Sequence, residues 1–298
     1  MPVMPPTPAA VRAFLRFTDR DPAEVLGVLA PENRQATVWN IAVNGVMAGC
    51  RPEYMPLLVA VVEVIAEERF RIEDAGSTPS IEPLIVVSGP IIRDLDLNSG
   101  QGVLKIGRQA NSSIGRFLRL YLRNICGYRI PPGDGDKGSI GFTFNVALAE
   151  DEQYARDIGW PTFGEELGFA SGQSAVTVQS VVCVSPPTYS SGAQAEGHAS
   201  QFVDAMYRAF QYWSYSGLKR GYWHSVIAVG PSIAKVIARE WSKDDLRRYI
   251  WEHATMPASL MKHFATKTGG MELDLPRLVG EGYLPPDYIA SEHPDRPL

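Results

Sequence analysis

The stretch PLIVVSGP, residues 83–90, places four consecutive large apolar residues before a Ser-Gly-Pro turn. A short apolar run bounded by turn residues is typical of a buried β-strand, so we predict a strand over residues 84–87. Pro90 suits the first turn of a helix, because the N–H that it lacks has no intrahelical partner there. The stretch therefore predicts a buried strand that leads directly into a short helix.

The residues before this strand predict a strand followed by a helix. Residues 37–43 (TVWNIAV) form another apolar run with β-branched members, which favours a strand. From residue 52 to residue 68, apolar positions recur at helical spacing (55, 58, 59, 62 and 65), so we predict a helix that starts at Pro52. Residues 8–17 and 22–29 are expected to form two short helices in a proline-rich arm.

The same order of elements is expected again later in the chain. Apolar runs predict strands over 178–184 and 226–229, and residues 193–213 between them have a helical pattern. The Gly-Pro pairs that follow strands 84–87 and 226–229 are 141 residues apart, and the ends of strands 37–43 and 178–184 are separated by the same 141 residues. We therefore predict an internal duplication.

The two copies differ in length. The helix expected over 116–122 resembles the one expected over 245–251 at an offset of 129, so the first copy carries 12 extra residues in a Gly-rich loop within 98–111. The second of these helices has a capping-box start, with Ser242 as the cap and Asp245 in place of Glu.

Strand–helix–strand units with apolar strands favour parallel pairing and right-handed crossovers. We therefore predict an α/β fold in which two pseudo-repeated β-α-β halves pack into one globule, with mostly parallel strands and flanking helices. The expected parts are a proline-rich helical arm (1–36), the first half with its inserted loop (37–130), a connecting segment (131–175), the second half (176–260) and a C-terminal tail (261–298).

Charge excludes one class of partner. The chain has 28 basic and 33 acidic residues, a net charge of −5 and no basic run, so we expect no nucleic-acid partner. The strongest basic cluster, Arg116, Arg119 and Arg123, has helical spacing and is expected to form a solvated face.

Cysteine usage and hydropathy indicate the compartment. Cys50, Cys126 and Cys183 are far apart and form no CxxC pair, which favours a reducing environment. The first residues lack the pattern of a secretory signal, and the longest apolar run, 57–62, is too short to cross a bilayer. We therefore expect a cytoplasmic protein with no membrane partner.

Cys50 lies in the turn expected between the first strand and the helix that starts at Pro52. Ligands bind beyond the carboxyl ends of parallel strands, and helix N-termini and cationic neighbours such as Arg51 lower the pKa of a thiol. We expect Cys50 to be a nucleophile or an acid/base, with Glu53 and Tyr54 transferring protons. The alternatives are a buried, inert Cys50 and an exposed Glu53 that only favours the helix dipole.

Six polar residues are expected to bind the substrate. They lie at the ends of the predicted strands or in the Gly-rich stretch, where amides, hydroxyls and a guanidinium near a helix N-terminus can hold a carboxylate or a phosphate. Ordinary turn and cap chemistry is the alternative. The six are Asn44, Ser88, Asn98, Ser99, Arg108 and Asn111. The chain has no P-loop, no dinucleotide-binding motif and no histidine pair at metal-ligand spacing, so we expect no cofactor and no metal site.

Several motifs together resemble a known group of proteins. They are AGCRPEY (48–54), PLIVVSGP (83–90), NSG (98–100), RQANSSIGR (108–116) and WSKDDLRR (241–248). From about residue 10 to about residue 260, the chain is similar to a poorly characterised bacterial family whose members occur fused or adjacent to a small domain with a selenocysteine- or cysteine-Gly-Ser-Cys motif, the UGSC family.

The resemblance implies a thiol-centred enzyme, with a separate UGSC-type chain as a candidate partner. Relatives tend to carry a histidine before the strand that corresponds to 84–87, where this chain has STPS (77–80). If that histidine is a base or a ligand in relatives, its role is missing or displaced in this chain.

These observations favour a cysteine-dependent enzyme. Without a redox-cofactor motif, we expect addition/elimination, hydration or hydrolysis of a small anionic or carbonyl-bearing metabolite, that is, a lyase, hydratase or hydrolase. The alternatives are a thiol-redox enzyme and a non-catalytic subunit, either of which would work with a separate (seleno)cysteine-bearing chain. We also expect the chain to form a homo-oligomer.

Overall fold

The computed structural model describes residues 2–76, 81–129, 144–182, 184–210, 225–257, 280 and 295–297. The chain divides into two compact units. The first comprises Met1–Arg156 and Pro161–Val182, and the second comprises Asp157–Trp160 and Cys183–Leu298.

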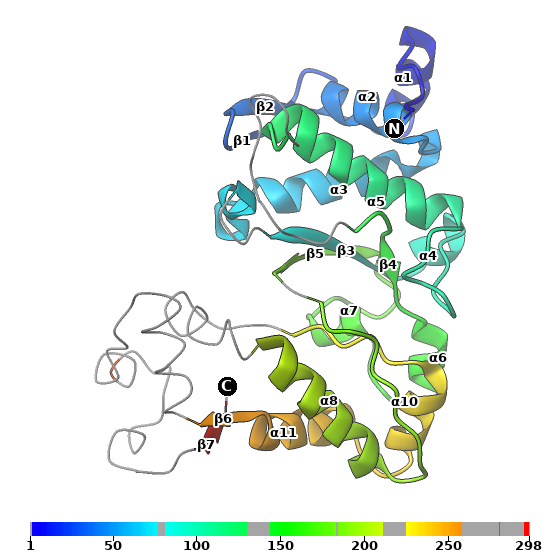
Figure 1. Ribbon diagram of the computed structural model, residues 1–298. Helices are drawn as coiled ribbons and strands as arrows, with labels where there is room; N and C mark the ends of the chain where they lie inside the picture. The colour runs from blue at the N-terminus through cyan, green and yellow to red at the C-terminus, as the bar shows by residue number, and fades with distance from the viewer. Residues whose placement is uncertain are drawn as a thin grey trace. The chain divides into compact units, whose positions relative to one another are not determined.

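The chain up to residue 182 mixes helices with short strands (Figure 1). In order, the elements are α1 (Pro8–Leu15), β1 (Val25–Leu29), β2 (Arg34–Thr37), α2 (Val38–Ala48), the 3-10 turn η1 (Pro52–Tyr54), α3 (Met55–Ala66), the 3-10 turns η2 (Glu68–Phe70) and η3 (Ile72–Gly76), β3 (Glu82–Ser88), α4 (Ile91–Asp94), α5 (Gln109–Tyr121), the π-turn η4 (Leu122–Cys126), β4 (Leu148–Ala149), α6 (Glu152–Asp157), α7 (Phe163–Glu166) and β5 (Ala175–Val181).

Residues 37–43 begin a helix, so the strand predicted there is wrong. The Thr37 side chain accepts a hydrogen bond from the Asn40 N–H (3.1 Å) and caps α2. Positions 38, 41, 42 and 45 are buried together, which is helical spacing. Within a short apolar run, the period of a strand cannot be told from that of a buried helix. The packing of α2 against α1 and α5 selects the helix.

The helices predicted on either side of α2 are confirmed. α1 covers most of 8–17, and α3, preceded by η1, covers most of 52–68. α1 packs Phe14 so closely against α2 that a β-carbon at Gly45 would lie 2.7 Å from the Phe14 ring. Residues 22–29, which we expected to be helical, instead contain β1, because their apolar residues pair antiparallel with β2 across a short hairpin.

β3 is the centre of a three-stranded sheet in the order β4-β3-β5. All seven β3 residues are buried, which confirms the strand predicted over 84–87. β4 pairs parallel to β3, but β5 pairs antiparallel to it, from Glu82 opposite Val181 to Ser88 opposite Ala175. The mostly parallel arrangement is not confirmed, because an apolar composition indicates burial on both faces and does not set strand direction. α3 and α5 cover one face of this sheet (Figure 1).

The expected duplication is not confirmed. The offset of 141 residues pairs 37–43, which lead into α2, with 178–184, which include the end of β5. Residues 226–229 form no strand, although both Gly-Pro pairs do precede helices, α4 and α10 (Pro231–Ala238). β5 begins the second half predicted from the sequence, yet it shares a sheet with β3 of the first half.

α5 begins further toward the N-terminus than the predicted 116–122 and connects the helices to the sheet. A β-carbon at Gly115 would lie 2.2 Å from the Val146 nitrogen, so glycine is the residue that lets this segment lie against α5. The Ala147 N–H donates to the Asn111 carbonyl (2.8 Å), and β4 starts at the next residue. α5 therefore sets the position of β4 beside β3.

The second unit contains α8 (Ala195–Phe210), α10, α11 (Lys243–His253) and the antiparallel pair β6 (Thr255–Pro257) and β7 (Asp295–Pro297). The capping box predicted at α11 is confirmed: the Ser242 hydroxyl accepts from the Asp245 N–H (3.1 Å), and the Asp245 carboxylate accepts from the Ser242 N–H (3.0 Å). Among the described residues of both units, no helix is long and apolar enough to cross a bilayer.

Candidate functional site

Cys50 lies at a helix–helix corner and not at the end of a strand. Gly49 ends α2 in the left-handed conformation (φ 80°), which glycine adopts without steric cost, and its N–H donates to carbonyls of α2. The Cys50 N–H donates to the Gly45 carbonyl (3.0 Å), and η1 begins at Pro52. The thiol is therefore presented by the tight turn between α2 and η1.

One face of α5 lies against this turn. Gln109, Ser113 and Arg116 are spaced i, i+4 and i+7, which places them on one side of the helix. Gln109 Nε2 donates to the Gly49 carbonyl (3.3 Å), and Ser113 and Arg116 both act electrostatically on the Cys50 thiol. These four side chains, Cys50, Gln109, Ser113 and Arg116, are called the Cys50 cluster below.

The Cys50 thiol is neutral at physiological pH. Cys50 is 8% exposed, and burial raises the pKa of its thiol from 9.0 to about 12, while hydrogen bonding to Ser113 and the charge of Arg116 lower it by less. The expected lowering of this pKa is wrong for two reasons. η1 is a turn of three residues with little dipole, and the Arg51 guanidinium contacts other groups.

Arg51, Glu53 and Tyr54 form a group of their own. Arg51 Nε lies 3.0 Å from Glu53 Oε1, Arg51 Nη2 donates to the Leu95 carbonyl (3.3 Å), and the guanidinium lies 5.0 Å above the Tyr54 ring. Tyr54 is buried, which raises the pKa of its hydroxyl above the ordinary value. No hydrogen bond between described residues joins Glu53 to Cys50, so proton transfer by Glu53 or Tyr54 stays a prediction.

Two buried atoms of the Cys50 cluster, Ser113 Oγ and Arg116 Nε, have no hydrogen-bond partner of regular geometry. The Ser113 hydroxyl is close enough to the sulfur to favour the thiolate, and Arg116 Nη2 donates to the Pro2 carbonyl. Native proteins pair nearly all buried polar groups, and exceptions are retained where strain or function requires them. Arg51 Nε and Tyr121 Oη, outside the cluster, also have no hydrogen-bond partner, so the Cys50 cluster is a candidate site because it joins a thiol to a buried guanidinium nitrogen.

Sequence reasoning missed the importance of Ser113 and Arg116. Arg116 was expected to belong to a solvated face with Arg119 and Arg123, but its Nε is buried, and Arg119 pairs with the buried Glu82 (3.1 Å). The signal that identifies the cluster is the helical spacing of Gln109, Ser113 and Arg116. It can be interpreted only when α5 is known to begin at residue 109.

Asn44, one of the six predicted substrate-binding residues, connects helices. It lies inside α2 and is 2% exposed. Its Nδ2 donates to the Asn40 carbonyl (2.9 Å), and its Oδ1 accepts from Asn124 Nδ2 of η4 (2.7 Å). Both ends of the amide are occupied, which gives Asn44 a structural role.

Asn98 and Asn111, two more of the predicted substrate-binding residues, are hydrogen-bonded to each other. Asn111 is 1% exposed; its Oδ1 accepts from the Asn98 N–H (2.7 Å), and its Nδ2 donates to the carbonyls of Asn98 (3.0 Å) and Ala147 (2.9 Å). The Asn98 side chain donates to the Gln101 carbonyl and accepts from the Gly100 N–H. Asn111 therefore ties the loop to α5.

Arg108 and Ser99 lie on the outside of this loop. Arg108 Nη1 contacts both carboxylate oxygens of Asp96 at 2.9 Å, and both side chains are exposed, so the pair contributes little stability. Ser99 is half-buried. Neither residue has a described contact with Cys50.

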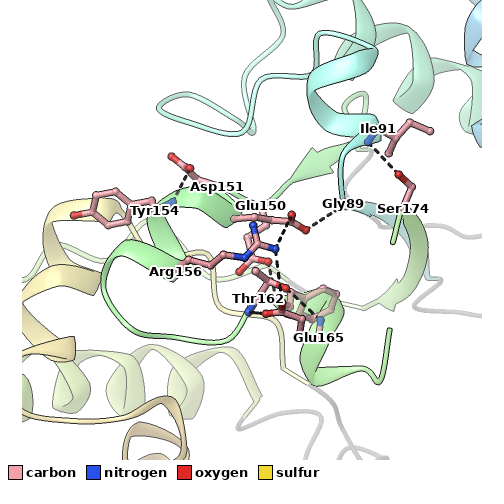
Figure 2. Close-up of polar contacts among 11 residues, drawn as sticks. Gly89, Ile91, Glu150, Asp151, Tyr154, Arg156, Thr162, Glu165 and Ser174 are labelled. Carbon is pink, nitrogen blue, oxygen red and sulfur yellow. Dashed lines mark hydrogen bonds and ion pairs between the residues drawn. The ribbon is translucent and has the colours of Figure 1, made fainter. Parts of the chain in front are cut away.

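Ser88 is the last residue of β3. The residues that follow it contribute to a separate group of polar contacts at the carboxyl ends of β3 and β4 (Figure 2). The Gly89 N–H donates to Glu152 Oε1 (2.7 Å), and the Ile91 N–H donates to Ser174 Oγ (3.1 Å). Ser88 itself is 3% exposed. Ligands bind beyond the carboxyl ends of parallel strands, so this group is the second candidate site.

The carboxylates of this second group already have partners (Figure 2). Backbone N–H groups donate to three of them: Phe163 to Glu150 (2.6 Å), Tyr154 to Asp151 (3.1 Å) and Thr162 to Glu165 (2.9 Å). Arg156 lies 3.5 Å from Glu152 and 3.7 Å from Glu165. The adjoining hollow measures about 10 Å³, room for about one water. We interpret these contacts as structural, because they connect the ends of β3 and β4 to α7.

Within the described residues, no group of three or more His, Cys, Asp or Glu side chains is arranged to hold a metal ion. Comparisons of the chain with protein-family models, curated proteins and solved structures give no significant match. The similarity to the UGSC-associated family, and a partner chain that follows from it, therefore stay predictions.

The two buried thiols predict a loss of stability at alkaline pH. Burial raises the pKa of Cys50 and of Cys126 from 9.0 to about 12. Their stabilisation is complete below pH 9 and is lost as the pH rises to 12, because the unfolded chain then releases protons that the folded chain keeps. We expect the free energy of unfolding to fall by up to about 1.4 kcal/mol per pH unit for each thiol.

Urea unfolding between pH 8 and pH 10 measures this slope. A Cys126→Ala variant is less stable because a buried side chain is lost, but its slope should be shallower than that of the wild type. Equal slopes in the two proteins would contradict the proposed neutral state of the thiol.

Proposed function

We propose that the chain is an enzyme that acts on a small anionic or carbonyl-bearing metabolite at the Cys50 cluster, by addition/elimination, hydration or hydrolysis. The observation that supports it is a thiol beside a hydroxyl and a guanidinium, in which the buried Arg116 Nε has no hydrogen-bond partner. A guanidinium binds anions and stabilises the negative charge that develops on a carbonyl oxygen.

The chemistry starts from a neutral thiol. In an addition to a carbonyl compound, the sulfur–carbon bond forms, the π bond of the carbonyl breaks, and the thiol proton passes to the carbonyl oxygen. In this proposal the Ser113 hydroxyl relays that proton, and the charge of Arg116 stabilises the oxygen. Since the thiolate is the stronger nucleophile, we expect the rate of thiol addition to rise with pH toward the pKa of about 12.

The burial of Cys50 favours a second function, that of a non-catalytic subunit. A thiol that is 8% exposed with a pKa of about 12 is inert while the structure stays closed. Such a chain would serve a separate (seleno)cysteine-bearing partner by stabilising a complex. Thiol-redox exchange by Cys50 itself has less support, because that exchange also needs a thiolate.

Alkylation of the native protein distinguishes the two functions. Cys126 is a matched internal control, because it is fully buried and burial raises the pKa of its thiol to about 12 as well. Burial is the cause that raises the Cys126 pKa, whereas at Cys50 the neighbouring Ser113 and Arg116 partly offset the effect of burial by lowering the pKa. Iodoacetamide modification of each thiol at pH 8 is followed by mass spectrometry of the two peptides.

For an enzyme that opens this cluster to its substrate, we expect Cys50 to react at least about tenfold faster than Cys126, since local opening needs less free energy than global unfolding. Equal rates for the two thiols, both limited by unfolding of the whole unit, would rule out the enzyme and favour the subunit.

A further inference from the structure

The N-terminal residues lie over the Cys50 cluster. The Met4 N–H donates to the Met47 carbonyl near the end of α2 (3.2 Å), and Arg116 Nη2 donates to the Pro2 carbonyl. A β-carbon at Gly49 would lie 4.0 Å from Met4 Cγ, so this side chain covers the turn that precedes Cys50. Residues 2–6 are called the N-terminal segment below.

The N-terminal segment is held much more weakly than α1, which follows it. Val3 and Met4 are 40% and 57% exposed, whereas Val11 and Phe14 of α1 are 1% and 3% exposed. Among the described residues, the two hydrogen bonds above are the ones that connect the segment to the Cys50 cluster and α2, and each contributes about 1 kcal/mol net. The segment can therefore leave while α1 stays packed.

One edge of the Arg116 guanidinium lies beside the N-terminal segment, and only one of the two nitrogens on that edge donates a hydrogen bond. Nε and Nη2 together form the fork that binds a carboxylate through two parallel hydrogen bonds. In the structure Nη2 donates to the Pro2 carbonyl, whereas Nε is buried and unpaired. No carboxylate within the described part of the chain pairs with Arg116. One carbonyl oxygen thus stands where a carboxylate would supply two oxygens and a negative charge.

We infer that the Cys50 cluster binds a carboxylate on Nε and Nη2 of Arg116, and that the N-terminal segment covers this site until the carboxylate displaces the Pro2 carbonyl. The inference rests on the proposed function and narrows its substrates to small carboxylates. The Ser113 hydroxyl and the Cys50 thiol then face the atoms next to the bound carboxylate. Displacement of the segment also uncovers the turn that precedes Cys50.

Two alkylating reagents of nearly equal size test the carboxylate preference. Iodoacetate carries a carboxylate where iodoacetamide carries a neutral amide, and both alkylate a thiol. With rates normalised to those of free cysteine, we expect native Cys50 to prefer iodoacetate at least about tenfold, because an ion pair with Arg116 orients the reagent. Cys126 should show no such preference.

Substitutions in α5 test whether the preference of Cys50 for iodoacetate depends on the Arg116 guanidinium. Arg116→Gln should remove it, and Arg116→Lys should retain only part of it, because an ammonium keeps the charge but lacks the fork. Arg123→Gln is the matched control: it removes the same charge from an exposed position on the next turns of the same helical segment and should leave the preference unchanged. Circular dichroism checks that the variants are folded.

A second measurement does not depend on thiol reactivity. In a Cys50→Ser variant, acetate is titrated at constant ionic strength with chloride as the control, and the Met4 amide and Arg116 Nε–H signals are followed by NMR. We expect both signals to move saturably with acetate and not with chloride, and the Met4 response to be lost when Arg116→Gln is added.

The outcomes separate the two proposals. If Cys50 reacts rapidly but without a preference for iodoacetate, and acetate moves neither signal, the carboxylate site is overturned while the enzyme stands. If acetate moves both signals but Cys50 reacts no faster than Cys126, the carboxylate site is supported and the thiol enzyme is overturned.

Discussion

A Gly115→Ala variant is expected to lose at least about 3 kcal/mol of unfolding free energy in the first unit, although alanine is the better helix former by about 1 kcal/mol. The added β-carbon would lie 2.2 Å from Val146 N and 2.5 Å from Asn145 C. These are backbone atoms and cannot rotate away as a side chain does. The segment must move off α5, which breaks the bond from the Ala147 N–H to the Asn111 carbonyl.

Urea unfolding of the full chain, followed by far-UV circular dichroism, measures this loss. Gly107→Ala is the control. It is also a glycine-to-alanine substitution, it lies just before α5, and a β-carbon there would meet nothing within 4 Å. We expect the control to stay within about 0.5 kcal/mol of the wild type. A Gly115→Ala variant as stable as this control would contradict the close packing of residues 145–147 on α5.

An Asn111→Ala variant is expected to lose about 2–4 kcal/mol of unfolding free energy. The Asn111 amide makes three hydrogen bonds, with the N–H and carbonyl of Asn98 and the carbonyl of Ala147. Asn111 is 1% exposed, so its removal leaves buried backbone groups without partners, and each unpaired group costs more than the bond contributed. Loosening of the 98–101 loop should accompany the loss of stability.

Asn98→Ala is the matched control for this variant. The Asn98 side chain bonds only within its own loop, to Gln101 and Gly100, so we expect a loss below about 1 kcal/mol. Thermal unfolding of the two variants side by side gives the comparison. If Asn111→Ala were as stable as the wild type, the structural role that its three hydrogen bonds give Asn111 would be contradicted.

The positions of several elements followed from local patterns. The strand at 84–87, the helix after Pro52 and the capping box at Ser242 are confirmed, because each depends on residues adjacent in the chain. Gln109, Ser113 and Arg116 lie beside the Cys50 turn, but the local pattern did not identify Ser113 and Arg116, and the strand expected before that turn is the helix α2.

The errors share one physical origin. An apolar run such as 37–43 is compatible with a strand or a buried helix until its packing partners are known. The direction of β5 relative to β3 depends on the path of the whole chain between them, which no local pattern encodes. The expected duplication is not confirmed, because it compared short apolar runs, and 37–43 and 178–184 belong to different kinds of element.

By itself, the sequence determined where the apolar strand β3, the helix α3 and the capping box of α11 form, and that a thiol at residue 50 precedes a turn that starts with proline. Only the tertiary structure decided the charge of that thiol. Its pKa is raised to about 12 by burial, which outweighs the lowering by Ser113 and Arg116 of α5, while the neighbouring Arg51 pairs with Glu53. Burial is a property of the whole packed chain, so it outweighs the local charges that a sequence displays.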